Sequence, residues 1–137
     1  MNDCIFCRIV DGRIPSEKLF ENDRVLAILD INPVAPGHAL VLTKAHHELV
    51  TDLPADLLAE WIARTQEIAR AVVKAASAEG FNLLSNNHKC SGQAIPHVHF
   101  HVIPRRTGDG IKFAWVPVKY PEGEMGAWAE KIRKAMG

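Results

Sequence analysis

The chain has 137 residues, of which 47% are hydrophobic and 23% are charged, and its 16 Lys and Arg residues balance its 16 Asp and Glu residues. This length and composition are typical of one globular domain, so we predict a single domain over residues 1–137. The zero net charge gives no support for a nucleic-acid or membrane partner, and no apolar run reaches the ~18 residues of a transmembrane helix.

The N-terminal segment and the cysteines indicate the compartment. Met1-Asn2-Asp3-Cys4 lacks the basic and then apolar pattern of a signal peptide. The chain has three cysteines, an odd number, and two of them form the Cys4-x-x-Cys7 pair. This usage favours a reducing compartment and a metal or redox role over a disulfide scaffold. We therefore expect a cytoplasmic protein.

The first third of the chain predicts one helical turn followed by three short strands. Residues 4–10 are apolar on one side and favour a single helical turn. Short apolar runs predict strands over residues 18–21, 25–29 and 39–43. The residues between these strands are typical of turns and loops, namely Asn22-Asp23 and then Pro33, Pro36 and Gly37.

Residues 53–79 predict the longest helix. Apolar residues recur there at steps of three and four, from Leu57 to Val73. Asp52 is expected as the N-cap and Gly80 as the C-terminal cap. Because the apolar stripe must cover a sheet face, we expect Trp61 in the core rather than in contact with a ligand.

The second half of the chain completes the expected sheet. Residues 81–86 predict a strand, a polar loop follows, and residues 97–103 predict the last strand. Trp128, Ile132 and Met136 are spaced by four within a terminal helix expected over residues 122–136. These elements predict an α+β fold, with a mostly antiparallel five-stranded sheet, one long helix and a C-terminal helix.

The last strand carries three histidines in alternation with apolar residues. His97, His99 and His101 alternate with Val98, Phe100 and Val102, and successive side chains of a strand point to opposite faces. Burying three imidazoles on one face is costly without a use for them. A purification tag or adventitious metal patch would not need the packed apolar face, so the pattern favours a functional site.

The segment His97-Val98-His99-Phe100-His101-Val102-Ile103 resembles the signature of the histidine triad (HIT) family, His-φ-His-φ-His-φ-φ with φ apolar. Companion segments also fit the family, in this order: Cys4-Ile5-Phe6-Cys7-Arg8-Ile9-Val10, Ile14-Pro15, residues 29–38 and Asn86. The resemblance implies a HIT-like fold, a homodimer and a nucleotide hydrolase or nucleotidyl transferase. That activity acts at the α-phosphate of purine nucleotide conjugates, such as nucleoside phosphoramidates or dinucleoside polyphosphates.

The resemblance also assigns roles around the phosphate. His99 is expected as the nucleophile that forms a nucleotidyl-histidine, which water then hydrolyses. His101 is expected to contact the phosphate oxygens, His97 to position the other rings, and Gln93 to contact the phosphate or the leaving group. Position 94 departs from a frequent family pattern, because Ala94 stands where a Ser or Thr hydroxyl often lies near the leaving group.

The rest of the nucleotide pocket follows from the same resemblance. Asp30 is expected to hold the ribose hydroxyls, with a strand-end cap as the alternative. Asn86 matches an asparagine near the phosphate. Apolar walls suit a purine, and the positions that match the nucleobase site are Phe6, Ile9, Ile14, Ile28 and Ile31.

The Cys4-x-x-Cys7 spacing suits two thiolate ligands of a zinc ion, which needs about four nitrogen or sulfur ligands. His46 and His97 are the candidates for the other two, and family members with this cysteine pair resemble zinc binders of this type. Such a zinc would be structural. A thioredoxin-like redox pair is the rival interpretation, but no βαβ pattern surrounds the cysteines.

Two other functions use the same residues. A zinc-stabilised purine-nucleotide-binding module with weak or lost catalysis would keep the pocket but would not need His99 as a nucleophile. A metal-storage protein would use the seven histidines and three cysteines to bind more than one metal per chain.

Overall fold

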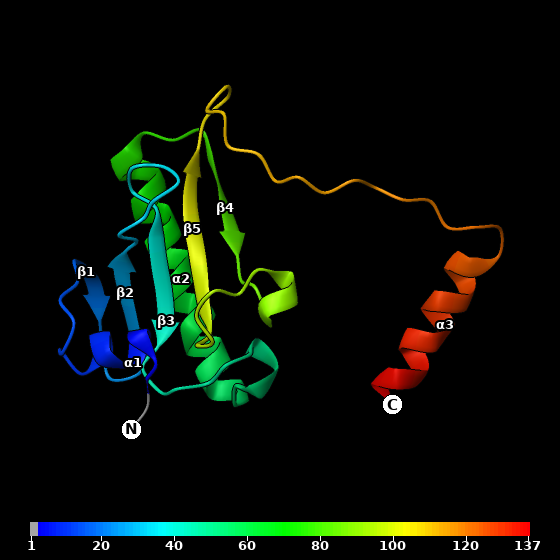
Figure 1. Cartoon of the computed structure of the whole chain (residues 1–137), viewed down its shortest axis with the longest axis horizontal. Helices are drawn as coiled ribbons and strands as arrows, with labels where there is room; N and C mark the ends of the chain where they lie inside the picture. The colour runs from blue at the N-terminus through cyan, green and yellow to red at the C-terminus, as the bar shows by residue number, and fades with distance from the viewer. Residues whose placement is uncertain (1–2) are drawn as a thin grey trace.

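The computed structural model describes residues 3–137, which form an antiparallel five-stranded sheet with the order β1-β2-β3-β5-β4 (Figure 1). The strands are β1 (Lys18–Glu21), β2 (Val25–Leu29), β3 (Ala39–Thr43), β4 (Gly80–Leu84) and β5 (His99–Arg105). The helices are α1 (Ile5–Val10), α2 (Ala55–Ala76) and α3 (Glu124–Met136), with short 3-10 turns η1 (Val50–Asp52) and η2 (Lys89–Ser91). The expected α+β architecture, with one long helix and a C-terminal helix, is confirmed.

Helix α2 covers one face of the sheet. Its buried residues recur at the expected steps of three and four, and they are Leu57, Trp61, Thr65, Ile68, Ala69 and Val72. The Trp61 ring stacks on Phe100 of β5 with 4.2 Å between centroids, and its indole N–H donates to the Val41 carbonyl at 2.9 Å. The side chain of Trp61 is fully buried, so its predicted place in the core is confirmed.

The ends of α2 differ from the prediction. The helix begins at Ala55 with Pro54 at the N-cap, while Asp52 belongs to η1 and accepts a hydrogen bond from the Leu49 amide at 3.3 Å. The C-cap is Ser77 in the left-handed region at φ 49°, and Gly80 instead begins β4. The reason is tertiary: the Arg106 guanidinium donates to the carbonyls of Ser77 and Ala76, which satisfies the helix end without a glycine.

Strand β5 starts two residues later than predicted. Its ladder with β3 ends at the pair Leu42 and His99, and the preceding Val98 amide donates to the His47 carbonyl instead. At its other end β5 runs through Pro104 to Arg105 by pairing with β4. Pro104 lies beyond the last β3 pair, where a residue without an N–H is tolerated because one side of the strand has no partner.

The second face of the sheet is only partly covered. Phe6 and Ile9 of α1 pack there against the inner residues of β2 and β3, namely Leu26, Ile28, Leu40 and Leu42. The helical turn predicted for residues 4–10 is therefore confirmed. The uncovered part of this face lies over β5 and β4, and it holds the candidate site.

After Arg105 the chain leaves the sheet as an arm, which we define as residues 106–137. Figure 1 shows it running past the β4 edge to α3, which stands away from the sheet and from α2. No residue of α3 is buried. Within residues 3–137, none of the helices combines the length and the apolar character that crossing a bilayer requires. The single domain expected over residues 1–137 stays a prediction, and its first two positions lie outside the described residues.

Candidate functional site

A cavity of about 1150 Å³ opens on the uncovered sheet face, between α1, the β2–β3 connection, β5 and the start of the arm. It brings together nine of the ten residues that the sequence assigned to the nucleotide, which are Phe6, Ile9, Ile14, Ile28, Asp30, Ile31, Asn86, His99 and His101. Most of these side chains are apolar, and Ile31 is 91% exposed. An apolar slot with a few polar groups is suited to a flat, partly polar ligand.

His99 presents a lone pair to this cavity. Its Nδ1 lies 2.6 Å from the His97 carbonyl oxygen, and a carbonyl can only accept, so Nδ1 carries the proton. Nε2 is therefore the basic nitrogen on the cavity side. The ring is 6% exposed, and burial lowers the pKa of His99 below its ordinary value. The imidazole is thus neutral near pH 7, as a nucleophile must be.

His101 presents the opposite group, an N–H. The Val34 amide donates to His38 Nδ1 at 3.1 Å, so His38 Nε2 carries the proton and donates to His101 Nδ1 at 2.9 Å. The remaining nitrogen of His101 must then hold its proton. Burial lowers the pKa of both rings, while the Asp30 carboxylate acts in the opposite sense. A lone pair and an N–H donor consequently stand on neighbouring rings, whose centroids are 5.0 Å apart.

Sequence reasoning did not select His38 as a site residue. It lies one residue before β3 and has the same parity as Leu40 and Leu42, whose side chains pack on the cavity side of the sheet. Extending the alternation of β3 by one residue upstream would have placed His38 on that face.

Asp30, His38 and His101 lie close enough to be considered as metal ligands. The hydrogen bonds oppose this use, because a metal needs a lone pair on His38 Nε2. That nitrogen keeps its proton as long as His38 Nδ1 accepts the Val34 amide. The arrangement is better described as a hydrogen-bond chain that fixes the protonation of His101.

A second cluster at the other end of β3 has the donor set of a metal site. The Sγ atoms of Cys4 and Cys7 and the Nδ1 atoms of His46 and His97 gather there. Sulfur–nitrogen distances are 3.4 Å for Cys4 with His97 and 3.4 Å for Cys7 with His46, and the two Nδ1 atoms are 3.2 Å apart. Tetrahedral bonds of about 2.3 Å to sulfur and 2.0–2.1 Å to nitrogen place such ligands roughly 3.3–3.6 Å from one another. The four residues fit a four-coordinate ion.

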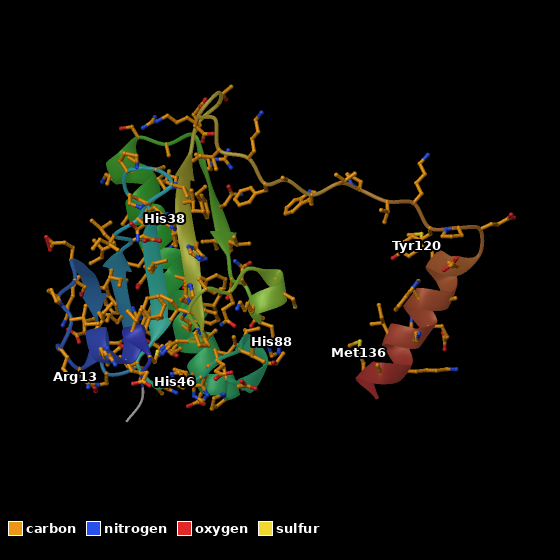
Figure 2. The ribbon with its side chains drawn as sticks, viewed as in Figure 1. Arg13, His38, His46, His88, Tyr120 and Met136 are labelled. Atoms are coloured by element: carbon orange, nitrogen blue, oxygen red, sulfur yellow. The ribbon has the colours of Figure 1, made fainter. Side chains whose placement is uncertain are left out.

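The tautomer of His97 suits this cluster. Its Nε2–H donates to the Thr43 carbonyl at 2.6 Å, which leaves the Nδ1 lone pair directed at the sulfur atoms. Full burial lowers the pKa of His97 to about 4, and a neutral ring is what a metal requires. His97 therefore faces the cysteines and not the cavity. Figure 2 shows His38 and His46 near opposite ends of the sheet, one beside each cluster.

Gln93 is the predicted nucleotide residue that does not line the cavity. Its amide nitrogen donates to the Glu48 carbonyl at 2.6 Å, and its amide oxygen accepts from the His88 amide at 2.9 Å. His88 has a positive φ of 71°, a conformation that a non-glycine residue holds only with support. In this structure Gln93 braces the loop, while its neighbours Gly92 and Ala94 line the cavity.

The sequence of the chain matches proteins of known family. Residues 11–108 match the sequence model of the HIT domain. An adenosine 5′-monophosphoramidase of Schizosaccharomyces pombe is 40% identical over 134 residues, covering 94% of this chain and 95% of that protein. An adenylylsulfatase of Arabidopsis thaliana is 43% identical over 108 residues, covering 79% of this chain but only 55% of the longer plant protein.

Solved structures of similar sequence share the fold. A protein of Streptococcus mutans is 39% identical and superposes with a TM-score of 0.93, covering 100% of this chain and 87% of its own. A zinc-bound histidine triad family protein of Mycobacterium smegmatis is 37% identical, with a TM-score of 0.76 and coverage of 97% of each chain. The first superposition includes the arm, so the arm has a similar course in that chain.

Proposed function

Because the chain belongs to the HIT domain family, we propose that it is a nucleotide hydrolase or nucleotidyl transferase acting at the α-phosphate of purine nucleotide conjugates. The observation that carries this proposal is the pairing of a lone pair on His99 with an N–H on His101 at one cavity wall. The names of the two relatives, an adenosine 5′-monophosphoramidase and an adenylylsulfatase, support an adenosine-containing substrate.

In the proposed reaction His99 Nε2 attacks the α-phosphorus, a phosphorus–nitrogen bond forms, and the bond from phosphorus to the leaving group breaks. The His101 N–H donates to a phosphate oxygen, where negative charge develops. Water then attacks the same phosphorus, which breaks the bond to His99 and releases the nucleotide. His99 Nδ1 keeps its proton and donates it in a hydrogen bond to the His97 carbonyl, which stabilises the positive charge that the ring gains on attack.

The cavity suggests how the nucleotide is held. Asp30 has one carboxylate oxygen committed to the Asn32 amide at 2.8 Å, and the proposed role of the other is to accept from the ribose. Ile9, Ile14 and Ile28 supply apolar surface for the purine, beside Phe6, whose ring meets His99 edge-on at 4.9 Å between centroids. Asn86 stands on the β4 side, next to Gly92.

We assign a structural zinc to Cys4, Cys7, His46 and His97. Four protein ligands leave no open position for substrate, which is the structural pattern. The metal would join the N-terminal helix to the ends of β3 and β5. We also propose a homodimer, because Phe81 and Leu83 of the edge strand β4 are 46% and 40% exposed beside the exposed Ile62 of α2.

The experiment that tests the enzymatic proposal is a single-turnover reaction with excess enzyme. Adenosine phosphoramidate, adenylyl sulfate and diadenosine polyphosphate are each mixed with the protein, and the intact chain is weighed by mass spectrometry at successive times. The expected result is a transient gain of one adenylyl group by the chain, located by digestion on a peptide containing His99 and followed by release of AMP. Adenosine monophosphate binding without turnover of any of the three compounds would favour the nucleotide-binding module instead.

A further inference from the structure

The charged side chains on the cavity wall are few, and they are divided between its two sides. Among the described residues that line the cavity, the acidic ones are Glu17 and Asp30 and, histidines aside, the basic one is Lys112. Glu17 precedes β1 and Asp30 follows β2, whereas Lys112 lies in the arm, beyond the end of β5. Because the sheet order is β1-β2-β3-β5-β4, the carboxylates and the ammonium group stand toward opposite edges of the sheet. An anionic part of a ligand is therefore attracted mainly at Lys112.

An ion pair at the end of β5 holds the start of the arm. Arg105 ends β5 and has the same parity as His101 and Ile103, so its side chain lies on the cavity face of the sheet. The guanidinium donates to both carboxylate oxygens of Asp109, at 2.7 and 2.9 Å, and to Asn82 Oδ1 at 2.7 Å. The Arg105 and Asp109 side chains are 24% and 17% exposed, so this two-point ion pair is shielded from solvent and well defined in geometry. We refer to Arg105 and Asp109 together as the clasp.

The clasp fixes the residues on both sides of Lys112. Arg105 Nη2 donates to the Ile111 carbonyl at 2.8 Å, and the Ile111 amide donates to Asp109 Oδ1 at 3.0 Å. The guanidinium also lies over the Phe113 ring, 5.8 Å from its centroid. Ile111, Lys112 and Phe113 all line the cavity. Because both neighbours of Lys112 are held, its backbone stands at the cavity wall before any ligand binds, which lowers the entropic cost of using its side chain.

The proposed position of the nucleotide brings its leaving group to the Lys112 side. With the ribose at Asp30 and the α-phosphate at His99 and His101, the nucleotide runs from β2 across β3 to β5. The same direction continues to the wall formed by β4 and residues 111–113, where the arm leaves the end of β5 and passes β4 (Figure 1). A group attached to the far side of the phosphorus therefore meets the ammonium group and not the carboxylates.

Leaving groups differ in how much they gain from a nearby cation. When His99 attacks a nucleotide with a phosphate or sulfate leaving group, the bond from phosphorus to the bridging oxygen breaks. The electron pair stays on that oxygen, so the departing anion gains one negative charge. A phosphoramidate instead loses its phosphorus–nitrogen bond, and the nitrogen takes a proton from water and departs as a neutral amine. An ammonium group at the leaving group stabilises the first transition state more than the second.

We propose that Lys112, placed by the clasp, binds the leaving group and makes the site selective for anionic leaving groups, such as phosphate chains and sulfate, over neutral amines. The inference rests on the proposed function, because it needs an α-phosphate that lies at His99 and His101. Arg105 and Asp109 are positioning residues in this proposal. Their charges are committed to each other, and they act on the substrate only through Lys112.

Equilibrium binding tests the proposal without turnover. Calorimetry compares AMP with α,β-methylene-ADP, whose terminal phosphate stands in for the leaving group and whose phosphorus–carbon bond resists cleavage. Lys112→Met removes the charge and keeps most of the apolar stem. It is expected to reduce the preference for α,β-methylene-ADP over AMP by roughly five- to twentyfold, and Lys112→Arg should retain most of that preference. Added salt should reduce the preference of the unmodified protein, because exposed charges are screened.

Lys119→Met is the matched control, because it removes the same charge from a lysine of the arm that does not line the cavity. It should leave the ratio of the two dissociation constants unchanged. An equal loss of affinity for both ligands in Lys112→Met, or the same change of ratio in Lys119→Met, would overturn the proposal.

Turnover then tests the clasp. The ratio of kcat/KM for adenylyl sulfate to kcat/KM for adenosine phosphoramidate should fall roughly fivefold or more in Lys112→Met. Asp109→Ala, which opens the clasp, should lower the same ratio, whereas a uniform loss on both substrates would contradict the positioning role. If the unmodified protein turns over neither substrate, the enzymatic proposal fails, and the ratio of dissociation constants still decides the role of Lys112.

Discussion

Each end of β3 lies beside a cluster that contains histidines, but the two clusters leave opposite nitrogens of the imidazole ring unprotonated. At one end His97 gives its Nε2–H to the Thr43 carbonyl and turns the Nδ1 lone pair to the cysteines. At the cavity His99 gives its Nδ1–H to the His97 carbonyl and turns the Nε2 lone pair to the cavity. The comparison teaches that a backbone carbonyl selects the nitrogen that remains basic, and thereby distinguishes the proposed metal ligand His97 from the proposed nucleophile His99 two residues away.

Removing His99, whose Nε2 lone pair faces the cavity, should have the largest effect on activity. His99→Ala is expected to lower kcat by several orders of magnitude while the protein stays folded, because the nucleophile is lost. His47→Ala, which alters a histidine outside the cavity wall, serves as the control. Steady-state hydrolysis of adenosine phosphoramidate and the far-UV spectrum measure the two properties. Near-normal turnover by folded His99→Ala protein would rule out the covalent mechanism.

Removing His38, which donates a hydrogen bond to His101, should lower activity by a smaller factor. His38→Ala deletes the donor to His101 Nδ1, and a loss of about 10- to 100-fold in kcat with little change in KM is expected, in line with other orienting residues. His38→Gln retains an N–H donor and should recover part of the rate. If Ala and Gln are equally impaired, His38 acts through packing and not through its hydrogen bond.

The metal cluster should respond mainly in stability. Chelation, or Cys4→Ser with Cys7→Ser, is expected to lower Tm by roughly 10 °C or more, because ligand binding is coupled to folding. Activity should fall less than tenfold, since His99 would be linked to the metal only through its hydrogen bond to the His97 carbonyl. Calorimetry and elemental analysis measure these effects, and Cys90→Ser is the control. One zinc per chain is the expected content; absence of zinc with an unchanged Tm would make the cysteine pair a packing feature, and several ions per chain would favour metal storage.

The pH dependence of activity and stability should distinguish the buried histidines of the cavity from an exposed histidine with an ordinary pKa. The pKa values of His38, His99 and His101 all lie below the ordinary value of 6.5 because of burial. The acid limb of kcat/KM is therefore expected below pH 6.5. In the same window the unfolded chain binds more protons than the folded chain, so the free energy of unfolding should fall as the pH is lowered from 6.5. A midpoint at or above pH 6.5 would contradict the assigned burial effect.

The smallest expected change concerns the leaving group. Ala94 lines the cavity without a hydroxyl, and Ala94→Ser should raise phosphoramidate turnover several-fold with little change in nucleotide affinity, because the added group would act mainly in the transition state. Ala94→Gly is a control for backbone and volume effects. A lower KM with unchanged kcat would indicate that the hydroxyl assists binding alone.

The sequence predicted the parts of this molecule that depend on local pattern. Alternation placed His99 and His101 on one strand, and steps of three and four placed Trp61 in the core. The loop contacts of Gln93 could not be predicted, because its partners, the backbone groups of Glu48 and His88, are brought to it only by the folded loops. The cap at Ser77 depends on Arg106, which is also distant in sequence. Local pattern cannot reveal such contacts, because their partners come together only in the tertiary structure.

The double use of His97 has a consequence for how chains of this fold can vary. Its ring completes the cysteine cluster, whereas its carbonyl fixes the proton of His99, and the second function needs no metal. Cys4, Cys7 and His46 meet only the His97 ring in this cluster, so a lineage that lost all three would need other contacts to hold that ring. We expect these three positions to be gained and lost together across homologues, while the histidine at position 97 persists with or without them.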